Sequence, residues 1–213
     1  MPVYSHHTFE DGGIAIWRIE ENSDTLYAML DTSRYNSTLK SISHEARRAE
    51  WLAVRVLITE VLGNDKEIAY LPSGRPYLVD GSYHISISHT KGYAAIAYHR
   101  IRSIGIDIEH ISPRVNRIAH RFTHPDEAAF IDIHDTERQL MYHLVNWSAK
   151  EALYKLIDAP TAADFHEVFR ISPYTLAQQG ILAASFTTKN TLHTIFYKLH
   201  TEFVCTWVLS IED

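Results

Sequence analysis

Three carboxylates have the residue types and spacing that most plainly predict chemistry in this chain. Asp107 and Glu109 stand two apart, and Glu151 follows in a later segment. If residues 104–109 form a strand, alternate side chains share a face, so Asp107 and Glu109 project together. Neighbouring carboxylates repel each other, and Mg²⁺, a hard cation that takes oxygen ligands, relieves that repulsion. The alternative is a strand facing solvent, where such a pair costs little.

Glu151 belongs to a segment whose periodicity predicts a long helix. Advancing about 100° per residue from Leu140 places it in a largely apolar stripe. That stripe contains Leu140, Leu144, Trp147, Glu151 and Lys155; a second, roughly opposite, contains Val145, Ala149, Ala152 and Leu156; the solvated edge is expected at His143, Asn146 and Lys150. A helix with two apolar faces is usually buried from two sides, where a carboxylate needs a cation, a metal or a proton. An ion pair with Lys155 and metal ligation remain equal alternatives at this point.

Phosphate recognition would have to come from side chains. The sequence contains neither a G-x-x-x-x-G-K-[ST] loop nor a G-x-G-x-x-G turn, the two motifs that cradle phosphates with backbone groups. Arginine suits bidentate phosphate contacts, and lysine acts as a mobile point charge. The basic candidates are Arg47, Arg48, Arg75, His89, Lys150 and Lys155. For each of these taken alone, a solvated surface charge is the alternative.

The elements that would position these residues follow the same order in two halves of the chain. In the first half, Ser43 can cap a helix that stops at Gly63. Strands are then expected at 77–79, 84–88 and 93–98. In the second half, the expected elements are a strand at 103–108, a helix at 137–158 and strands at 167–171, 181–187, 193–199 and 202–211. This order predicts an α+β fold, a pseudo-repeat with domains 1–102 and 103–213.

The composition excludes several classes of protein. The 213 residues suit one large domain or two small ones, with 46% hydrophobic and 22% charged residues. A formal charge of −6 argues against a general nucleic-acid binder. No apolar run approaches the ~20 residues of a membrane span, and the first residues lack the features of a signal peptide. The single cysteine, Cys205, cannot form an internal disulfide and predicts a packing residue in a cytoplasmic protein.

Two blocks together resemble the signature of the 4′-phosphopantetheinyl transferases. Residues 104–109 (IGIDIE) match that family's (I/V)G(I/V)D-x-E strand, and residues 147–155 (WSAKEALYK) match its (W/F)S-x-KE-(A/S)-xxK helix. Weaker blocks resemble its GRP turn (73–76), its SH(S/T) strand end (86–90), its RF…E segment (121–127) and its R-x-E-x-L-x-x-R helix (47–55). The length resembles the surfactin-synthetase-activating subfamily. Its members are monomeric pseudo-dimers, each half a long helix on a small antiparallel sheet.

The resemblance assigns roles to residues of both halves. It implies that Mg²⁺ is held by Asp107, Glu109 and Glu151. It implies that coenzyme A is contacted by Arg75, Ser88 and His89, by Lys150 and Lys155 near the pyrophosphate, and by either Arg47 or Arg48 at the 3′-phosphate. In one departure from the family, the stretch 31–43 ahead of that helix carries only Arg34 and Lys40 as basic residues, where surfactin-type members carry several.

The implied activity is that of a holo-[acyl-carrier-protein] synthase. It transfers the phosphopantetheine arm of coenzyme A to a serine of an apo acyl or peptidyl carrier protein and releases 3′,5′-ADP. The serine proton could pass to Glu127, to Glu151 or to a metal-bound water, and we favour Glu151 or its water. Lys150 or Lys155 is expected to stabilise the leaving group together with Mg²⁺. The alternatives are another Mg²⁺-dependent phosphotransferase or nucleotide hydrolase, and a non-catalytic relative that binds carrier proteins.

Overall fold

The chain forms two compact units, one ending at Ile101 and the other beginning at Arg102. The structure is a computed structural model that describes residues 3–30, 34–63, 66–131, 134–158 and 165–211. Each unit combines helices with antiparallel sheets, which is the predicted fold class. That the two halves form a pseudo-dimer stays a prediction, as do the functions assigned to domains 1–102 and 103–213.

The N-terminal unit packs a long helix on a four-stranded antiparallel sheet. The sheet order is β1 (Ser5–Phe9), β2 (Gly12–Arg18), β6 (Tyr93–His99) and β5 (His84–Thr90). Helix α3 (Glu45–Leu62) covers it, with α1 (Ser23–Ala28), α2 (Asn36–Ser41) and the hairpin of β3 (Ile68–Tyr70) and β4 (Pro76–Leu78) alongside. Helix α3 stops at Gly63 as predicted, with φ at 74°, a conformation that favours glycine. Its N-cap is His44 rather than the expected Ser43.

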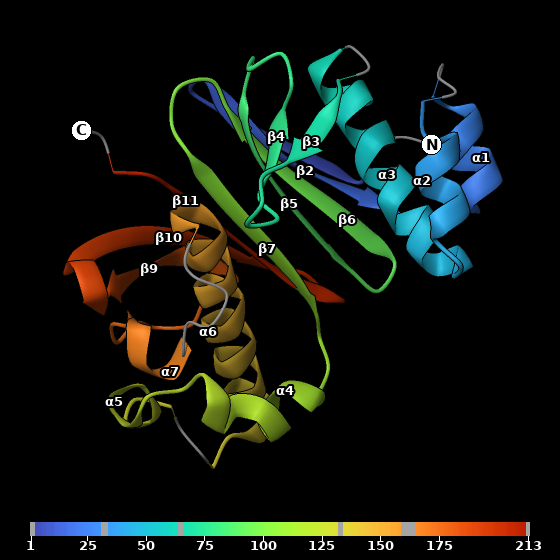
Figure 1. The fold of residues 1–213 in the computed structure, drawn as a ribbon. Helices are drawn as coiled ribbons and strands as arrows, with labels where there is room; N and C mark the ends of the chain where they lie inside the picture. The colour runs from blue at the N-terminus through green and yellow to red at the C-terminus, as the bar shows by residue number, and fades with distance from the viewer. Residues whose placement is uncertain (1–2, 31–33, 64–65, 132–133, 159–164, 212–213) are drawn as a thin grey trace. The chain divides into compact units, whose positions relative to one another are not determined.

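The C-terminal unit packs its long helix on a five-stranded sheet. The strand order is β7 (Ile104–His110), β11 (Phe203–Leu209), β10 (Thr191–Leu199), β9 (Gln179–Phe186) and β8 (Phe169–Ile171). Helix α6 (Thr136–Ile157) lies against β7 and β11 (Figure 1). The shorter helices are α4 (Arg114–Ile118), η1 (Ala119–Arg121), α5 (Pro125–Ala128), α7 (Phe165–Val168) and η2 (Thr187–Lys189). Within the described ranges, no helix is long and apolar enough to cross a membrane.

Gly105 sets how closely α6 approaches β7. A Cβ at this position would lie 2.1 Å from the backbone carbonyl oxygen of Ala152 and 3.0 Å from the amide nitrogen of Leu156. Only a residue without a side chain therefore allows this packing. The buried hydroxyls of Ser148 on α6 and Thr206 on β11 lie 2.9 Å apart and join the helix to that neighbouring strand. The glycine of the IGIDIE block thus serves the alignment of helix and strand.

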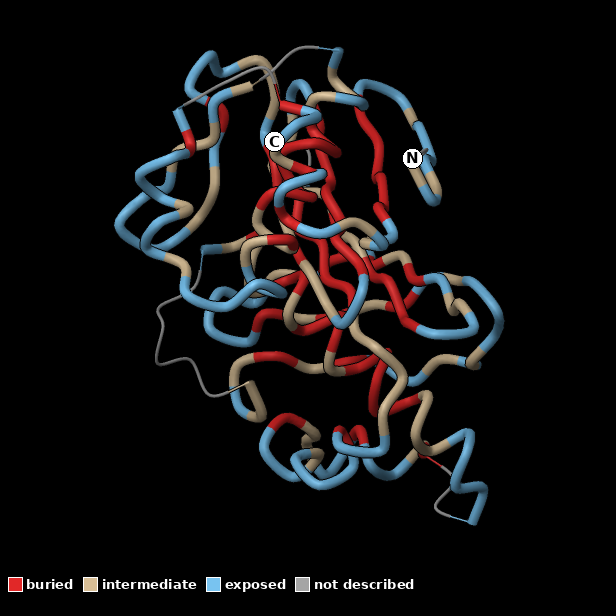
Figure 2. Tube along the Cα trace, turned by 90° about the vertical axis from the view of Figure 1, so that its right-hand side faces the viewer, coloured by how far each residue is buried: buried red, intermediate tan, exposed pale blue. Residues whose placement is uncertain are grey.

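The expected solvated edge of α6 is wrong. Asn146 and Lys150 have no exposed surface, and His143 is 8% exposed. The segment from α4 to α5 packs on the side of the helix that the wheel assigned to water, and Figure 2 shows the buried stretches in red. In this segment His143 bonds Asn116 and Lys150 donates to Glu127, while Asn146 accepts from the hydroxyl of Tyr174, which follows β8.

Candidate active site

Asp107 is held by Lys155 in the interior of the C-terminal unit. It pairs with Thr206 across the sheet, on the face that α6 covers, and is 4% exposed. Lys155 Nζ donates to Asp107 Oδ1 at 2.8 Å and to the carbonyl of Ile106 at 3.1 Å. The side chain of Lys155 stays 27% exposed. This lysine therefore neutralises a buried carboxylate while it keeps part of its surface at the solvent.

Glu109, two residues along β7, is held by Trp147. The indole Nε1–H donates to Glu109 Oε1 at 2.8 Å. The pKa of Glu109 is raised to about 7, chiefly by burial and then by the nearby Asp107, while the Trp147 hydrogen bond and Lys155 oppose the shift. The sequence predicts Trp147 as a member of the apolar helix stripe and of the WSAKE block, but not this contact with Glu109; its place one turn before Glu151 is the signal for it.

Glu151 completes an electrostatic cluster of three carboxylates. It is half-buried on α6, one turn after Trp147. The pKa of Glu151 is raised to about 7, chiefly by burial and also by Asp107 and Glu109, while Lys155 opposes the shift. One lysine thus faces three acidic groups, which leaves an excess of negative charge at this point of the unit.

The donor chemistry of this cluster fits Mg²⁺. Carboxylate oxygens are the ligands that this cation prefers, and two of the three groups are held partly protonated by burial and repulsion, which a divalent cation would reverse. Among the described residues, no three Asp, Glu, His or Cys side chains are already arranged to hold a metal ion. Metal ligation by Asp107, Glu109 and Glu151 therefore stays a prediction.

Lys150 and Glu127 lie in the interior of the unit, away from solvent. Both residues have no exposed surface, and Lys150 Nζ donates to Glu127 Oε2 at 2.8 Å. Burial lowers the pKa of Lys150, and Glu127 opposes that shift. In this arrangement neither side chain presents a polar atom at the surface. Their predicted roles, a phosphate contact and a candidate base, stay predictions that this placement does not favour.

The structure distinguishes the two arginines that the sequence left equivalent. Arg47 Nη1 lies in hydrogen-bond contact with His89 Nε2 and 3.3 Å from Glu50 Oε2. Glu50 Oε2 in turn lies 3.5 Å from His89 Nδ1. Arg48 instead donates to Glu45, 2.9 Å away, whose carboxylate also accepts from Ser23. Arg47 and His89, two predicted coenzyme contacts, therefore form one cluster on the N-terminal unit.

The other two predicted coenzyme contacts of the N-terminal unit lie on separate elements. Ser88 precedes His89 on β5 and is 7% exposed. Arg75 is half-buried in the turn between β3 and β4, where Gly74 adopts φ of 89°. Their contacts with coenzyme A stay predictions.

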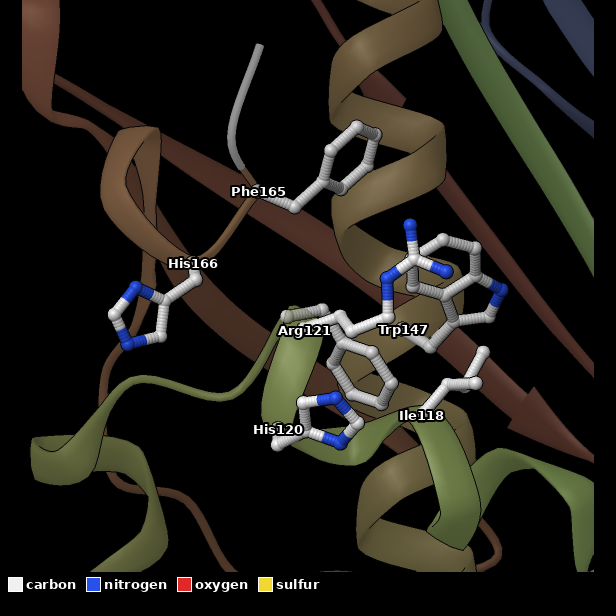
Figure 3. Close-up of a pocket in the computed structure, with 7 residues that line it drawn as sticks. Ile118, His120, Arg121, Trp147, Phe165 and His166 are labelled. Carbon is white, nitrogen blue, oxygen red and sulfur yellow. The ribbon is translucent and has the colours of Figure 1, made fainter.

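A pocket that the sequence did not predict lies beside the carboxylate cluster. It has a volume of about 730 Å³ and is lined by Ile118, His120, Arg121, Phe122, Trp147, Phe165 and His166 (Figure 3). One wall of the pocket is aromatic: the ring centroid of Trp147 lies 5.1 Å from that of Phe122 and 5.5 Å from that of Phe165. Arginine and two histidines add basic character to the opening. Because Trp147 also bonds Glu109, one indole separates this basic, aromatic pocket from the carboxylates.

The sequence of the C-terminal unit matches a known family of transferases. The family model of the 4′-phosphopantetheinyl transferase superfamily matches residues 103–208, the part of the chain that carries β7, α6 and all three carboxylates. This unit therefore belongs to the 4′-phosphopantetheinyl transferase superfamily. The surfactin-type subfamily stays a prediction.

Curated relatives show the same likeness. The chain is 34% identical over 112 residues to the 4′-phosphopantetheinyl transferase AcpT of Salmonella typhi, a match that covers 51% of this chain and 58% of that protein. It is 31% identical over 112 residues to the AcpT of Escherichia coli strain K12, covering 51% of this chain and 57% of the relative. The matched part thus spans little more than half the length of these relatives.

The raised pKa of Glu151 predicts how the stability of the metal-free protein depends on pH. The folded state holds a proton on Glu151 up to about pH 7, while the unfolded chain releases it near its ordinary pKa of about 4.3. Stability from this group is therefore fully present below about pH 4 and is lost as pH rises through about 7, by up to about 4 kcal/mol.

Urea unfolding in a metal chelator at pH 5 and pH 8 measures this effect. Between these pH values the wild type should lose more unfolding free energy than Glu151→Gln, which has no proton to release. The comparison of the two proteins cancels the titration of the histidines. Equal pH dependence in the two proteins would contradict the assignment.

Proposed function

We propose that this chain transfers the 4′-phosphopantetheine arm of coenzyme A to a serine hydroxyl of an apo acyl or peptidyl carrier protein and releases 3′,5′-ADP. The observation that carries the proposal is the acidic cluster of Asp107, Glu109 and Glu151 with Lys155, in a unit of the 4′-phosphopantetheinyl transferase superfamily. The net negative charge of this cluster would repel a substrate pyrophosphate unless a cation bound between them. Asp107, Glu109 and Glu151 would hold Mg²⁺, which when bound neutralises pyrophosphate charge.

Lys155 is the residue of this cluster best suited to a phosphate. Its ammonium already contacts Asp107 and keeps 27% of the side chain exposed. It would stabilise the negative charge that develops on the departing nucleotide. Lys150, which donates to Glu127 and to a backbone carbonyl, is less suited to this role.

Glu151 is the better candidate to take the serine proton, directly or through a water molecule. It is half-buried on α6 and interacts electrostatically with Asp107 and Glu109, so it lies at the proposed reaction centre, where a general base must be within reach of the hydroxyl. Glu127 has both carboxylate oxygens engaged in the interior. A base in reach contributes about 10²–10⁴-fold to the rate.

The basic pocket would receive the carrier protein. Carrier proteins of this class are generally acidic around the target serine, while this chain has a net charge of −6, so a local basic surface is needed for docking. Arg121 supplies positive charge, His120 supplies a polar ring, and the rings of Phe122 and Trp147 supply apolar area. The pocket also lies one indole away from Glu109, so a segment bound there would be close to the reacting groups.

Mass spectrometry of candidate apo carriers tests the function. Each carrier is incubated with coenzyme A, Mg²⁺ and this protein, and one serine should gain the mass of the phosphopantetheinyl arm. Coenzyme A turnover that proceeds equally without a carrier would identify a hydrolase or another phosphotransferase. Carrier binding without any mass change, at saturating coenzyme A and Mg²⁺, would identify a non-catalytic relative.

Arg47 rather than Arg48 is proposed to contact the 3′-phosphate of coenzyme A, because it shares a cluster with His89. Arg47→Ala should raise KM for coenzyme A about 10–100-fold, the value of a charge-assisted hydrogen bond. Arg48→Ala, which breaks only the contact with Glu45, serves as the matched control and should change KM less than about threefold.

Dephospho-coenzyme A, which lacks the 3′-phosphate, sharpens this experiment. With that substrate Arg47→Ala and the wild type should have similar KM values, because the group that the arginine binds is missing. A larger effect of Arg48→Ala, or an Arg47 effect that persists with dephospho-coenzyme A, would reverse the assignment.

A further inference from the structure

Glu127 is saturated by hydrogen bonds that come from three different elements. Its Oε2 accepts from the backbone N–H of His124 at 2.9 Å and from Lys150 Nζ at 2.8 Å. Its Oε1 accepts from the backbone N–H of Ile171 at 2.7 Å. The residue has no exposed surface. A carboxylate so placed fixes backbone, and it has no path by which to receive a proton from a substrate.

Lys150 extends the same network from the middle of α6. Besides Glu127, its ammonium donates to the backbone carbonyl of Phe122. The pair thus ties the backbone at both Phe122 and His124, the two ends of a short segment ahead of α5. Neither side chain lies at the surface, so the pair has no role in binding a ligand directly.

Of the three elements joined at Glu127, the segment ahead of α5 and helix α6 also line the basic pocket, and the third, β8, follows directly on the lining helix α7. Phe122 is one end of the tied segment, and Arg121 precedes it at the end of η1. Trp147 belongs to α6, and Phe165 and His166 belong to α7, which leads directly into β8. Ile171, whose amide bonds Glu127, lies on β8. The buried pair therefore stands where the walls of the pocket are connected to each other.

We propose that Glu127 and Lys150 are positioning residues that hold the walls of this pocket in place for the acceptor protein, and that Glu127 is not the base. The inference rests on the proposed function in that the acceptor is a carrier protein docking at the pocket. The pair acts by geometry: it fixes where Arg121 and Phe122 stand relative to Trp147. It contacts neither the acidic cluster of Asp107, Glu109 and Glu151 nor the proposed coenzyme contacts of the N-terminal unit.

Steady-state kinetics of three variants separate positioning from base catalysis. Glu127→Gln leaves the ammonium of Lys150 buried without a counter-charge, so the walls should loosen. KM for the apo carrier should rise about tenfold or more, KM for coenzyme A should stay within about threefold, and kcat should fall less than about tenfold. Lys150→Met should act alike. The double variant Glu127→Gln/Lys150→Met removes both charges and should recover most of the carrier affinity.

Base catalysis predicts the opposite pattern. If Glu127 were the base, Glu127→Gln would lower kcat by about 10²–10⁴-fold at unchanged KM. Adding Lys150→Met to that variant could not restore the missing proton acceptor. That result would overturn the proposal. Asp126→Asn is the matched control, because Asp126 neighbours Glu127 on α5 with its side chain 83% exposed. It should behave as the wild type does.

Hydrogen exchange tests the same role without an activity assay. In Glu127→Gln the amides of His124 and Ile171 should exchange about tenfold faster or more than in the wild type, and the double variant should reverse part of this change. Exchange at these amides that equals the wild type would refute the positioning role, whether or not the protein modifies a carrier. Faster exchange in Glu127→Gln, together with a wild type that modifies no carrier, would instead refute the proposed function and still support the positioning role of Glu127 and Lys150.

Discussion

Glu151→Gln is expected to abolish Mg²⁺-dependent transfer while the fold stays intact. The substitution removes one carboxylate of three from the acidic cluster and keeps the size of the side chain, so kcat/KM should fall at least about 10³-fold. The change also removes the group that we propose as base. Measurement of carrier modification at saturating coenzyme A, with the metal concentration varied, gives both the rate and the apparent metal affinity.

The matched control is Glu137→Gln, at the exposed first turn of the same helix. It should retain wild-type activity and metal dependence. A Glu151→Gln protein that modifies its carrier at the wild-type rate would remove this residue from the chemistry and, with it, the main support for the acidic cluster as the active site. Circular dichroism of each variant excludes unfolding as the cause of lost activity.

Gly105→Ala should destabilise the C-terminal unit by about 3 kcal/mol, the upper end of the range for overpacked sites. The added methyl group would meet the Ala152 carbonyl at 2.1 Å, and backbone atoms rather than a flexible side chain must move to make room. Urea unfolding measures the loss. Gly81→Ala is the control: the site has open space, and its φ of 64° carries only the conformational cost of about 1–2 kcal/mol.

A helix displaced from β7 also moves Lys155 relative to Asp107, whose 2.8 Å contact depends on that approach. Gly105→Ala should therefore weaken apparent Mg²⁺ affinity in the protein that remains folded, an effect absent from Gly81→Ala. If Gly105→Ala and Gly81→Ala unfold at the same urea concentration and bind metal alike, the close approach of α6 and β7 contributes neither to the free energy of unfolding nor to metal affinity.

Much of this arrangement could be predicted from the sequence because its strongest signals are local. The 3.6-residue period predicted α6, which runs from Thr136 to Ile157, close to the expected 137–158. The alternation of IGIDIE predicted β7 and placed the side chain of Asp107 on the opposite face from its apolar neighbours. The side-chain period of a strand is only two residues, so six residues are enough to reveal it. The sequence motifs of the matching family lie on these two elements.

The rest required contacts between segments distant in sequence. Strand β2 is buried along nearly its whole length, so it lacks the alternation that reveals a strand with one wet face. A helical wheel cannot show that a third layer covers Asn146 and Lys150. Nor could spacing tell Arg47 from its neighbour, since the choice depends on His89, which lies 42 residues further along.

Trp147 lies between the basic pocket and the acidic cluster of the C-terminal unit and contacts both. The face of its ring lines the basic pocket, while its N–H holds Glu109. Anything that presses on the ring from the pocket changes the hydrogen bond at the carboxylate, and any change in the charge of Glu109 changes how firmly the ring is held. Linkage makes such an influence reciprocal: if an occupied pocket tightens cation binding by some factor, the cation tightens the pocket's hold on its occupant by the same factor.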